Sequence, residues 1–503
     1  MSRALLVSIA ALTIAAPFHD QLLAQKSYVT EVSNKSNAAV AMLPMSTSSA
    51  DARMHATLGQ RALDMGRVAE AAQHFQAAVA ADPTSAFAQL GAANASPSFA
   101  DYDAKLAAAV KLAPNASRAE QLQIGIARHT LISDYAGAEG LARGLIAAAP
   151  DNPRSYLALA NVQQQEGKEA EARVTLKNAI SVAPNFSPTY LQLAYSYMTA
   201  QPTDPAKAKP YVDKLVALEP KESRAFIVQG SYYRATNQLP LARRSYTRAA
   251  QLDPTQAMPL QQRAHVESFL GSYDAARADY DAAIKRGKQN EPGMYAMFRA
   301  LVPAHAGNPK QSITELDQLV KDADGMNLPD PIGVKIGALT AEIQIAVQSG
   351  DFESASRAIA QRAPLVREQV AQSTDEKVKR LADADNVYFD GLLAARQGDA
   401  TVAKTKADEY MRLVAETSDP QKDQRAHAIL GVLALEQKDF PGAVVQLEQA
   451  NPNDIYMMYE RALALDGAGR KAEAKALFRK IAHYNFNGAD VAMVRADAAK
   501  RSK

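Results

Sequence analysis

The sequence predicts an all-α protein, a solenoid of stacked helical hairpins. Alanine, which has the highest helix propensity, recurs in runs such as Ala107–Ala109 and Ala147–Ala149. Valine and isoleucine do not alternate with polar residues over any strand-length segment. From residue 51 onward, small, aromatic and proline residues return at a spacing of about 34, the period of a helix–turn–helix unit. Because 503 residues exceed one ordinary compact core, an array of units is expected.

The first residues predict export. Met1–Arg3 is a short basic start, and Ala4–Ala16 is apolar except for Ser8 and Thr13. This layout is typical of a secretory signal peptide, and the apolar stretch falls short of the ~20 residues of a spanning helix. We therefore predict a signal peptide at residues 1–24, with an uncleaved membrane anchor as the alternative. Residues 25–51 are rich in Ser, Asn and Thr and are predicted to be a flexible linker.

The clearest unit spans residues 52–85, and each recurring residue in it has a physical role. Gly59 is small, so that two helices can approach closely, and the bulky Phe75 fills the gap between neighbouring units. Gly66 permits a tight turn between the helices. Pro83 ends the second helix.

The same set of residues returns through a regular array predicted for residues 52–290. One insertion, around residues 201–205, falls in a turn, where a solenoid tolerates extra residues. The further copies of the set are Tyr156, Gly167, Ala172, Leu176 and Pro184; Phe226, Gly230, Ala242, Tyr246 and Pro254; and Ala264, Gly271, Ala276, Tyr280 and Ala283.

Beyond residue 290 the units diverge. Residues 291–486 form a looser array with turns near Gly307, Gly350, Gly398 and Gly469. Residues 322–330 and 363–382 are predicted to be longer loops or extended helices. Residues 487–503 are predicted to form a solvated C-terminal capping helix or a tail, because a terminal repeat needs a polar outer face. The expected total is about twelve units.

These units resemble tetratricopeptide repeats (TPRs), of an exported bacterial type, over nearly the whole chain after residue 51. The resemblance implies a right-handed superhelix whose first helices line a concave groove, and it implies protein binding as the function. The large aromatic residue expected early in the first helix is Tyr156, Phe226 or something smaller, and the chain has no Trp.

Composition and motifs indicate no catalytic chemistry. The net charge of +2 is well mixed, which argues against a nucleic-acid surface and a polybasic membrane patch. The absence of Cys excludes disulfides and thiolate catalysis. Metalloprotease, phosphate-loop and serine-nucleophile motifs are absent, and no two His residues share a metal-binding spacing. We therefore predict no enzyme activity, no cofactor and no metal.

Two acidic clusters are weak candidates for other chemistry. Residues 322–325 faintly suggest a calcium loop, but the ligands that should follow are missing, so a turn is predicted. Asp383 and Asp385 do not share a helix face and are predicted to be solvated charges. An enzyme with its site at residues 320–385 stays a remote alternative.

The repeat frame places a set of polar, basic and aromatic side chains on the predicted concave groove. Asn and Gln can bond a peptide backbone, and Arg can bind a carboxylate through two hydrogen bonds. We therefore predict a protein or peptide partner with acidic residues or a free carboxylate; the alternative is an ordinary solvated groove. The set is Arg154, Asn161, Gln164, Tyr195, Met198, Arg224, Ser231, Arg234 and His265.

Three functions remain open besides the remote enzyme. The leading one is a protein-interaction scaffold of a bacterial cell envelope, with the periplasm as the expected location and secretion or membrane anchoring as alternatives. The second is an envelope assembly or chaperone-like factor that holds client proteins. The third is a cytosolic regulator, which requires that residues 1–24 are retained.

Overall fold

The computed structural model describes residues 40–503, in which every regular element is a helix and no strand occurs. The predicted signal peptide and most of the predicted linker lie outside the described residues. Three short 3-10 turns, η2 (Ala113–Asn115), η3 (Pro205–Ala208) and η4 (Ala323–Met326), join some of the helices. The α-helices are α2 (Ala50–Asp64), α3 (Val68–Ala81), α4 (Ala86–Asn94), α5 (Phe99–Leu112), α6 (Arg118–Leu131), α7 (Tyr135–Ala148), α8 (Pro153–Glu166), α9 (Glu169–Val182), α10 (Ser187–Thr199), α11 (Lys209–Leu218), α12 (Ser223–Ala235), α13 (Leu239–Leu252), α14 (Met258–Leu270), α15 (Tyr273–Arg286), α16 (Glu291–Ala300), α17 (Val302–His305), α18 (Pro309–Asp322), α19 (Pro331–Ser349), α20 (Phe352–Val370), α21 (Glu376–Arg396), α22 (Ala400–Val414), α23 (Gln424–Glu436), α24 (Phe440–Leu447), α25 (Ile455–Gly467), α26 (Lys471–Ala482) and α27 (Ala489–Arg501).

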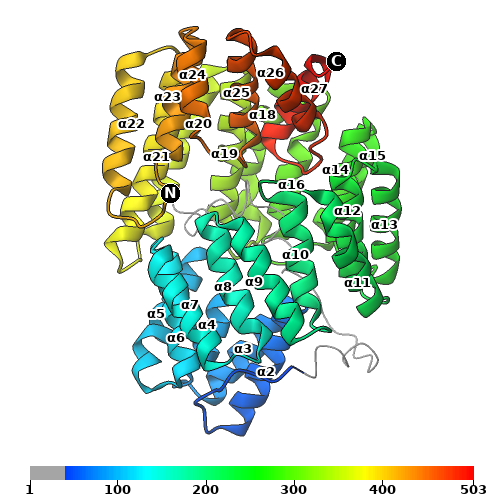
Figure 1. Cartoon of the computed structure of the whole chain (residues 1–503), viewed down its shortest axis with the longest axis vertical. Helices are drawn as coiled ribbons and strands as arrows, with labels where there is room; N and C mark the ends of the chain where they lie inside the picture. The colour runs from blue at the N-terminus through cyan, green and yellow to red at the C-terminus, as the bar shows by residue number, and fades with distance from the viewer. Residues whose placement is uncertain (1–39) are drawn as a thin grey trace.

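Consecutive helices pack in pairs, from α2 with α3 to α25 with α26, and each pair stacks on the next (Figure 1). Counting α16 and α17 as one first helix, residues 50–482 form twelve hairpins, and α27 follows them as a cap. This confirms the predicted all-α solenoid and the expected number of about twelve units.

The turns form where the sequence predicted them. Gly66, Gly167, Gly271 and Gly350 have φ angles of 72°, 85°, 78° and 76°. A residue with a side chain is strained in this left-handed region, whereas glycine is not. Glycine therefore ends these four first helices without a cost in backbone strain. The insertion near residue 201 lies in the connection between α10 and η3, as predicted.

Helix crossings explain a second group of glycines that recur in the repeat, those within the first helices. A Cβ atom added to Gly59 would lie 2.9 Å from the Phe75 ring, and one added to Gly230 would lie 2.5 Å from the Tyr246 ring. The small residue on the first helix therefore makes room for the large residue on the second, which confirms the role predicted for Gly59 and Phe75.

In most hairpins after α2 and α3, the first helix buries more of its surface than the second. In α14, buried residues run from Met258 to Gln262 and from Ala264 to Ser268, whereas α15 buries only Ala276, Tyr280 and Ala283. First helices therefore line the inside of the superhelix, and second helices form its outer surface.

The superhelix closes on itself, so that hairpins far apart in sequence meet. The loop between α22 and α23 reaches the turns of two early hairpins. The Ser418 hydroxyl donates to the Asp134 carboxylate at 2.9 Å, and the Gln421 amide donates to the Glu166 carbonyl at 2.8 Å. In Figure 1 the yellow hairpin of α21 and α22 accordingly extends down toward the cyan helices.

The described end of the predicted linker differs from the expectation. Leu43 is buried, the Ala41 carbonyl accepts from Arg154 at 3.1 Å, and the Ser46 amide donates to Glu120. Residues 40–49 therefore pack against α6 and α8 as part of the folded structure, because their backbone groups find partners there. The first helix begins at Ala50, two residues before the predicted start.

The structure decides two alternatives that the sequence left open: longer loops or extended helices in the second half, and a capping helix or a tail at residues 487–503. Helices α19, α20 and α21 have 19, 19 and 21 residues, so extended helices account for most of the wider repeat spacing. The C-terminal residues form the predicted capping helix, α27, but it is exposed on one face only, which includes Lys500 and Arg501. Val491, Val494 and Ala498 are buried because α27 packs against α17, α19, α25 and α26.

Candidate partner-binding surfaces

The predicted groove residues all lie on first helices, α8, α10, α12 and α14, and most are buried. Asn161 is exposed, Gln164 and Arg224 are partly buried, and the others have little contact with solvent. Their part in partner binding stays a prediction; the structure gives the neighbours that each of them has within the chain.

Two of the predicted arginines are held by the chain's own carboxylates. Arg154 pairs with Asp64, which its Nε also approaches at 3.2 Å. The Arg224 Nε donates to Glu219 at 2.7 Å, and its Nη1 donates to the Asp64 carbonyl at 2.7 Å. An acidic partner at this end of the concave face must therefore compete with Asp64 and Glu219.

The polar and aromatic members form internal hydrogen-bond chains. The Gln192 amide donates to both Asn161 and Gln164, the latter at 2.9 Å. The Ser231 hydroxyl lies 3.2 Å from the Tyr195 hydroxyl and 3.1 Å from the Tyr246 hydroxyl. Burial raises the pKa of Tyr195, so these phenols stay neutral hydrogen-bonding groups.

Arg234 and His265 lie deeper in the concave face. The Arg234 guanidinium donates to His265 Nδ1 at 3.1 Å and stacks on the Phe486 ring, with its carbon 4.6 Å from the ring centre. Burial, together with the charge of Arg234, lowers the pKa of His265 well below its usual value. The imidazole is therefore neutral at physiological pH, and its Nδ1 atom accepts the hydrogen bond from the guanidinium.

The chain's own residues 484–487, here called the C-terminal segment, occupy the concave face beside α12 to α17. The Asn485 amide donates to the Arg234 carbonyl at 3.1 Å and to Asn237 at 3.0 Å. The Asn487 amide donates to the Tyr280 hydroxyl at 3.2 Å. This segment thus fills part of the surface on which the sequence predicted a partner.

Asp385 is the charged residue most at variance with its predicted role. It is fully buried between Arg362 and Arg425, whose Nη1 approaches it at 2.7 Å. Burial acts to raise the pKa of Asp385, but the two guanidiniums outweigh it and lower the value to about 2. The prediction of a solvated charge is wrong because partners 23 and 40 residues away on α20 and α23 supply the pairing.

The other acidic cluster behaves as predicted, as a turn. Residues 323–326 form η4, and Asp324 pairs with Lys335 at 2.6 Å. Among the described residues no group of three His, Asp or Glu side chains is arranged to hold a metal ion.

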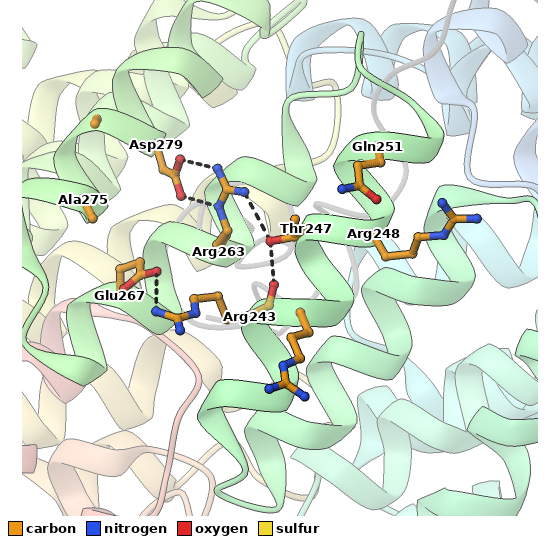
Figure 2. A pocket seen from close by; sticks show the side chains of 10 residues that line it. Arg243, Thr247, Arg248, Gln251, Arg263, Glu267, Ala275 and Asp279 are labelled. Carbon is orange, nitrogen blue, oxygen red and sulfur yellow. Dashed lines mark hydrogen bonds and ion pairs between the residues drawn. The ribbon is translucent and has the colours of Figure 1, made fainter.

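A cleft opens on the outer surface between α13 and α15, with α14 at its base (Figure 2). It has a volume of about 480 Å³. The small side chains of Ala275 and Ala278 on α15 leave this space between the two outer helices. Its other lining residues are Arg243, Arg244, Thr247, Arg248, Gln251, Arg263, Glu267 and Asp279.

The cleft carries more positive than negative charge, and its arginines differ in how they are paired. Arg263 binds Asp279 through two hydrogen bonds of 2.7 Å, which raise the pKa of the guanidinium. Arg243 reaches Glu267 at 3.6 Å. Arg244 and Arg248 are exposed and have no carboxylate partner within residues 40–503. The repeat pattern did not predict this cleft, although three arginines within six residues of one helix mark its position in the sequence.

Comparison with known proteins identifies the repeat. Two family models described as tetratricopeptide repeat match residues 133–195 and 262–327. These stretches run from the end of α6 into α10 and from α14 to the end of η4. The chain therefore contains tetratricopeptide repeats.

Curated relatives match only part of the chain. It is 31% identical over 144 residues to protein O-mannosyl-transferase TMTC1 of Mus musculus, covering 28% of this chain and 15% of that protein. The Homo sapiens protein of the same name is 31% identical over 143 residues, covering 28% and 16%. The chain thus spans about 15% of the length of these relatives.

Solved structures with a similar arrangement are distant. A tetratricopeptide repeat protein from Parabacteroides merdae is 16% identical with a TM-score of 0.36, covering 53% of this chain and 98% of that one. The type IV pilus biogenesis factor PilW is 16% identical with a TM-score of 0.31, covering 47% and 96%. MamA from Desulfovibrio magneticus is 15% identical with a TM-score of 0.29, covering 34% and 95%.

No helix within the described residues combines the length and the apolar character that crossing a membrane requires.

Proposed function

We propose that this protein is a non-catalytic scaffold that binds other proteins in a bacterial cell envelope. The observation that carries the proposal is the stack of twelve tetratricopeptide-type hairpins. A single hairpin cannot bury its apolar face alone, so stacking yields an extended surface whose natural use is binding. Export to the periplasm is part of the proposal and rests on the signal-like residues 1–24.

The partner is proposed to carry acidic side chains or a free carboxylate. Arginine recognises carboxylates through paired hydrogen bonds, and the repeats present arginines on both faces. On the concave face Arg154 and Arg224 are already paired, so a partner there would replace Asp64 and Glu219.

Two other functions are weaker candidates. A chaperone-like factor would use the same surfaces with lower affinity and more clients. A site for catalysis at residues 320–385 would need reactive groups free to act, whereas Asp385 is locked between Arg362 and Arg425. The match to an O-mannosyl-transferase covers 28% of this chain and is a weak argument for transferase activity.

Affinity capture tests the binding function. The immobilised protein is incubated with envelope extract, and retained proteins are quantified against a column carrying the heat-unfolded chain. We expect a small set of proteins that only the folded array retains. Retention of the same proteins by both columns would reject the scaffold proposal.

N-terminal sequencing of the mature protein tests export. We expect the mature chain to begin near residue 25, after loss of the signal peptide. A cytosolic protein that still begins at Met1 would favour the regulator and reject the periplasmic assignment.

A further inference from the structure

The outer face of α13 carries a line of hydrogen-bond donors that the fold itself leaves largely unused. Arg244 and Arg248 are four residues apart and therefore lie one above the other on the helix, and Gln251 extends the same face. All three are exposed. Figure 2 shows the Arg248 and Gln251 side chains standing apart from the Arg263–Asp279 pair.

The pairing of the neighbouring residues defines the charge of the cleft. Asp279 neutralises Arg263, and Glu267 lies 3.6 Å from Arg243, which is half exposed. Four arginines thus face two carboxylates, and both carboxylates are taken. Arg248 contacts the face of the Phe226 ring at 5.9 Å, which orients the guanidinium without neutralising it.

One arginine links the three helices that form the walls of the cleft. The Arg263 guanidinium spans α13, α14 and α15, because it binds Asp279 on one side and the Thr247 hydroxyl at 3.3 Å on the other. Ala275 and Ala278 leave room beside it for side chains from another molecule. A pre-formed site loses less conformational entropy when a ligand binds.

We propose that this outer cleft is a docking site for an acidic segment of a partner protein, with carboxylates that pair with Arg244 and Arg248. The inference rests on the proposed binding function and assigns it a surface and a partner class. Charge complementarity favours this occupant, because carboxylates at a four-residue spacing on a partner helix match the spacing of the two arginines. The concave face is a poorer candidate, since its arginines are paired and the C-terminal segment occupies part of it.

Fluorescence anisotropy with the full chain tests this assignment. The probe is a labelled helical peptide with Glu at four-residue spacing, and its counterpart has Gln at the same positions. We expect the Glu peptide to bind more tightly. Reversing the charges with Arg244→Glu and Arg248→Glu should weaken it by about tenfold or more, because two attractive pairs become repulsive.

A matched control separates the cleft from the general field of the protein. Lys285→Glu with Arg286→Glu makes the same change in net charge at two exposed positions on α15, outside the cleft. This variant should bind the Glu peptide nearly as the unmodified protein does. Equal losses in both double variants, or equal binding of the Glu and Gln peptides, would overturn the proposal. Circular dichroism melting curves verify that every variant is folded.

Two further measurements distinguish a different ligand at the cleft from a different binding surface. A uridine oligonucleotide that binds more tightly than the peptide, and is lost with Arg244→Glu and Arg248→Glu, would replace the acidic protein with nucleic acid as the ligand. In affinity capture, a cleft variant that retains the same proteins as the unmodified array would reject the cleft and leave the scaffold function intact.

Discussion

At the residue scale, the least expected feature is a carboxylate with no access to solvent. Asp385 pairs with Arg362 and Arg425 in the middle of the second half of the chain. Removing one member of such a group leaves buried charge without compensation, which costs far more than losing an exposed pair. Exposed charges on the same helix provide the comparison.

We expect Asp385→Ala to lower the free energy of unfolding by about 3–5 kcal/mol, because two buried guanidiniums lose their carboxylate. Asp383→Ala removes a largely exposed partner of Arg367 and should cost about 1 kcal/mol or less. Urea titration of both variants measures the difference. Similar losses would show that the group around Asp385 contributes no more than a surface pair.

Glycines at helix crossings give a second prediction at this scale, in which identical substitutions have opposite effects. In Gly230→Ala the new Cβ would lie 2.5 Å from the Tyr246 ring, so we expect a loss of about 1–3 kcal/mol from overpacking. Gly140 is exposed in α7 and has nothing within 4 Å, so Gly140→Ala should stabilise by about 0.5–1 kcal/mol. Thermal melting measures whether each variant is more or less stable than the unmodified protein. Stabilisation in both variants would contradict a close helix crossing at Gly230.

At the element scale, local patterns were sufficient to predict the hairpins but not the position of the last helix. The pairing of Gly59 with Phe75 and the turn at Gly66 depend on residues within one unit, so their spacing reveals them. The place of α27 depends on α17 and α19, which lie at least 140 residues earlier in the chain. The same limit applies to Asp385, whose partners come from other hairpins, and to the concave residues covered by the C-terminal segment.

The start of α27 predicts a dependence of stability on pH. Burial, with the nearby charge of Asp454, raises the pKa of Asp490 from 3.8 to about 7. The folded chain therefore holds a proton there that the unfolded chain releases above pH 4. This stabilisation is complete below the unfolded pKa and disappears as pH rises through 7.

We expect Asp490→Asn, which keeps the shape without the charge, to be more stable than the unmodified protein at pH 8 and close to it at pH 4. The difference at pH 8 should be on the order of 2–4 kcal/mol, since each unit of pKa shift corresponds to about 1.4 kcal/mol. Glu291 and Glu342, with pKa values raised to about 7, contribute in the same direction and cancel in the comparison. A pH-independent difference would reject this role for Asp490.

At the scale of the whole molecule, closure distinguishes this array from an open solenoid. In an open solenoid each repeat contacts only its neighbours, so a change at one end leaves distant repeats unaffected. Here the last residues pack on repeats about 250 positions earlier, as when Asn485 binds the Arg234 carbonyl. The red helices of Figure 1 accordingly lie beside the green ones.

Phe486→Ala tests whether this closure couples the two halves. The variant removes the ring on which Arg234 stacks, and truncation of a buried phenylalanine costs about 3–5 kcal/mol. Because Asn485 and Asn487 flank the ring, their bonds to α12 and α15 should loosen with it. We expect faster amide hydrogen exchange in α12 and α14, although the change lies more than 200 residues away in sequence.

The matched control is Phe478→Ala, which deletes a buried ring in α26 that packs on Tyr459 of the same hairpin. This variant should leave exchange in α12 unchanged. If Phe486→Ala leaves exchange in α12 and α14 unchanged, the C-terminal segment stabilises only its own end of the array. If the two variants accelerate that exchange equally, the cause is a general loss of stability and not a coupling through the contact between Phe486 and Arg234.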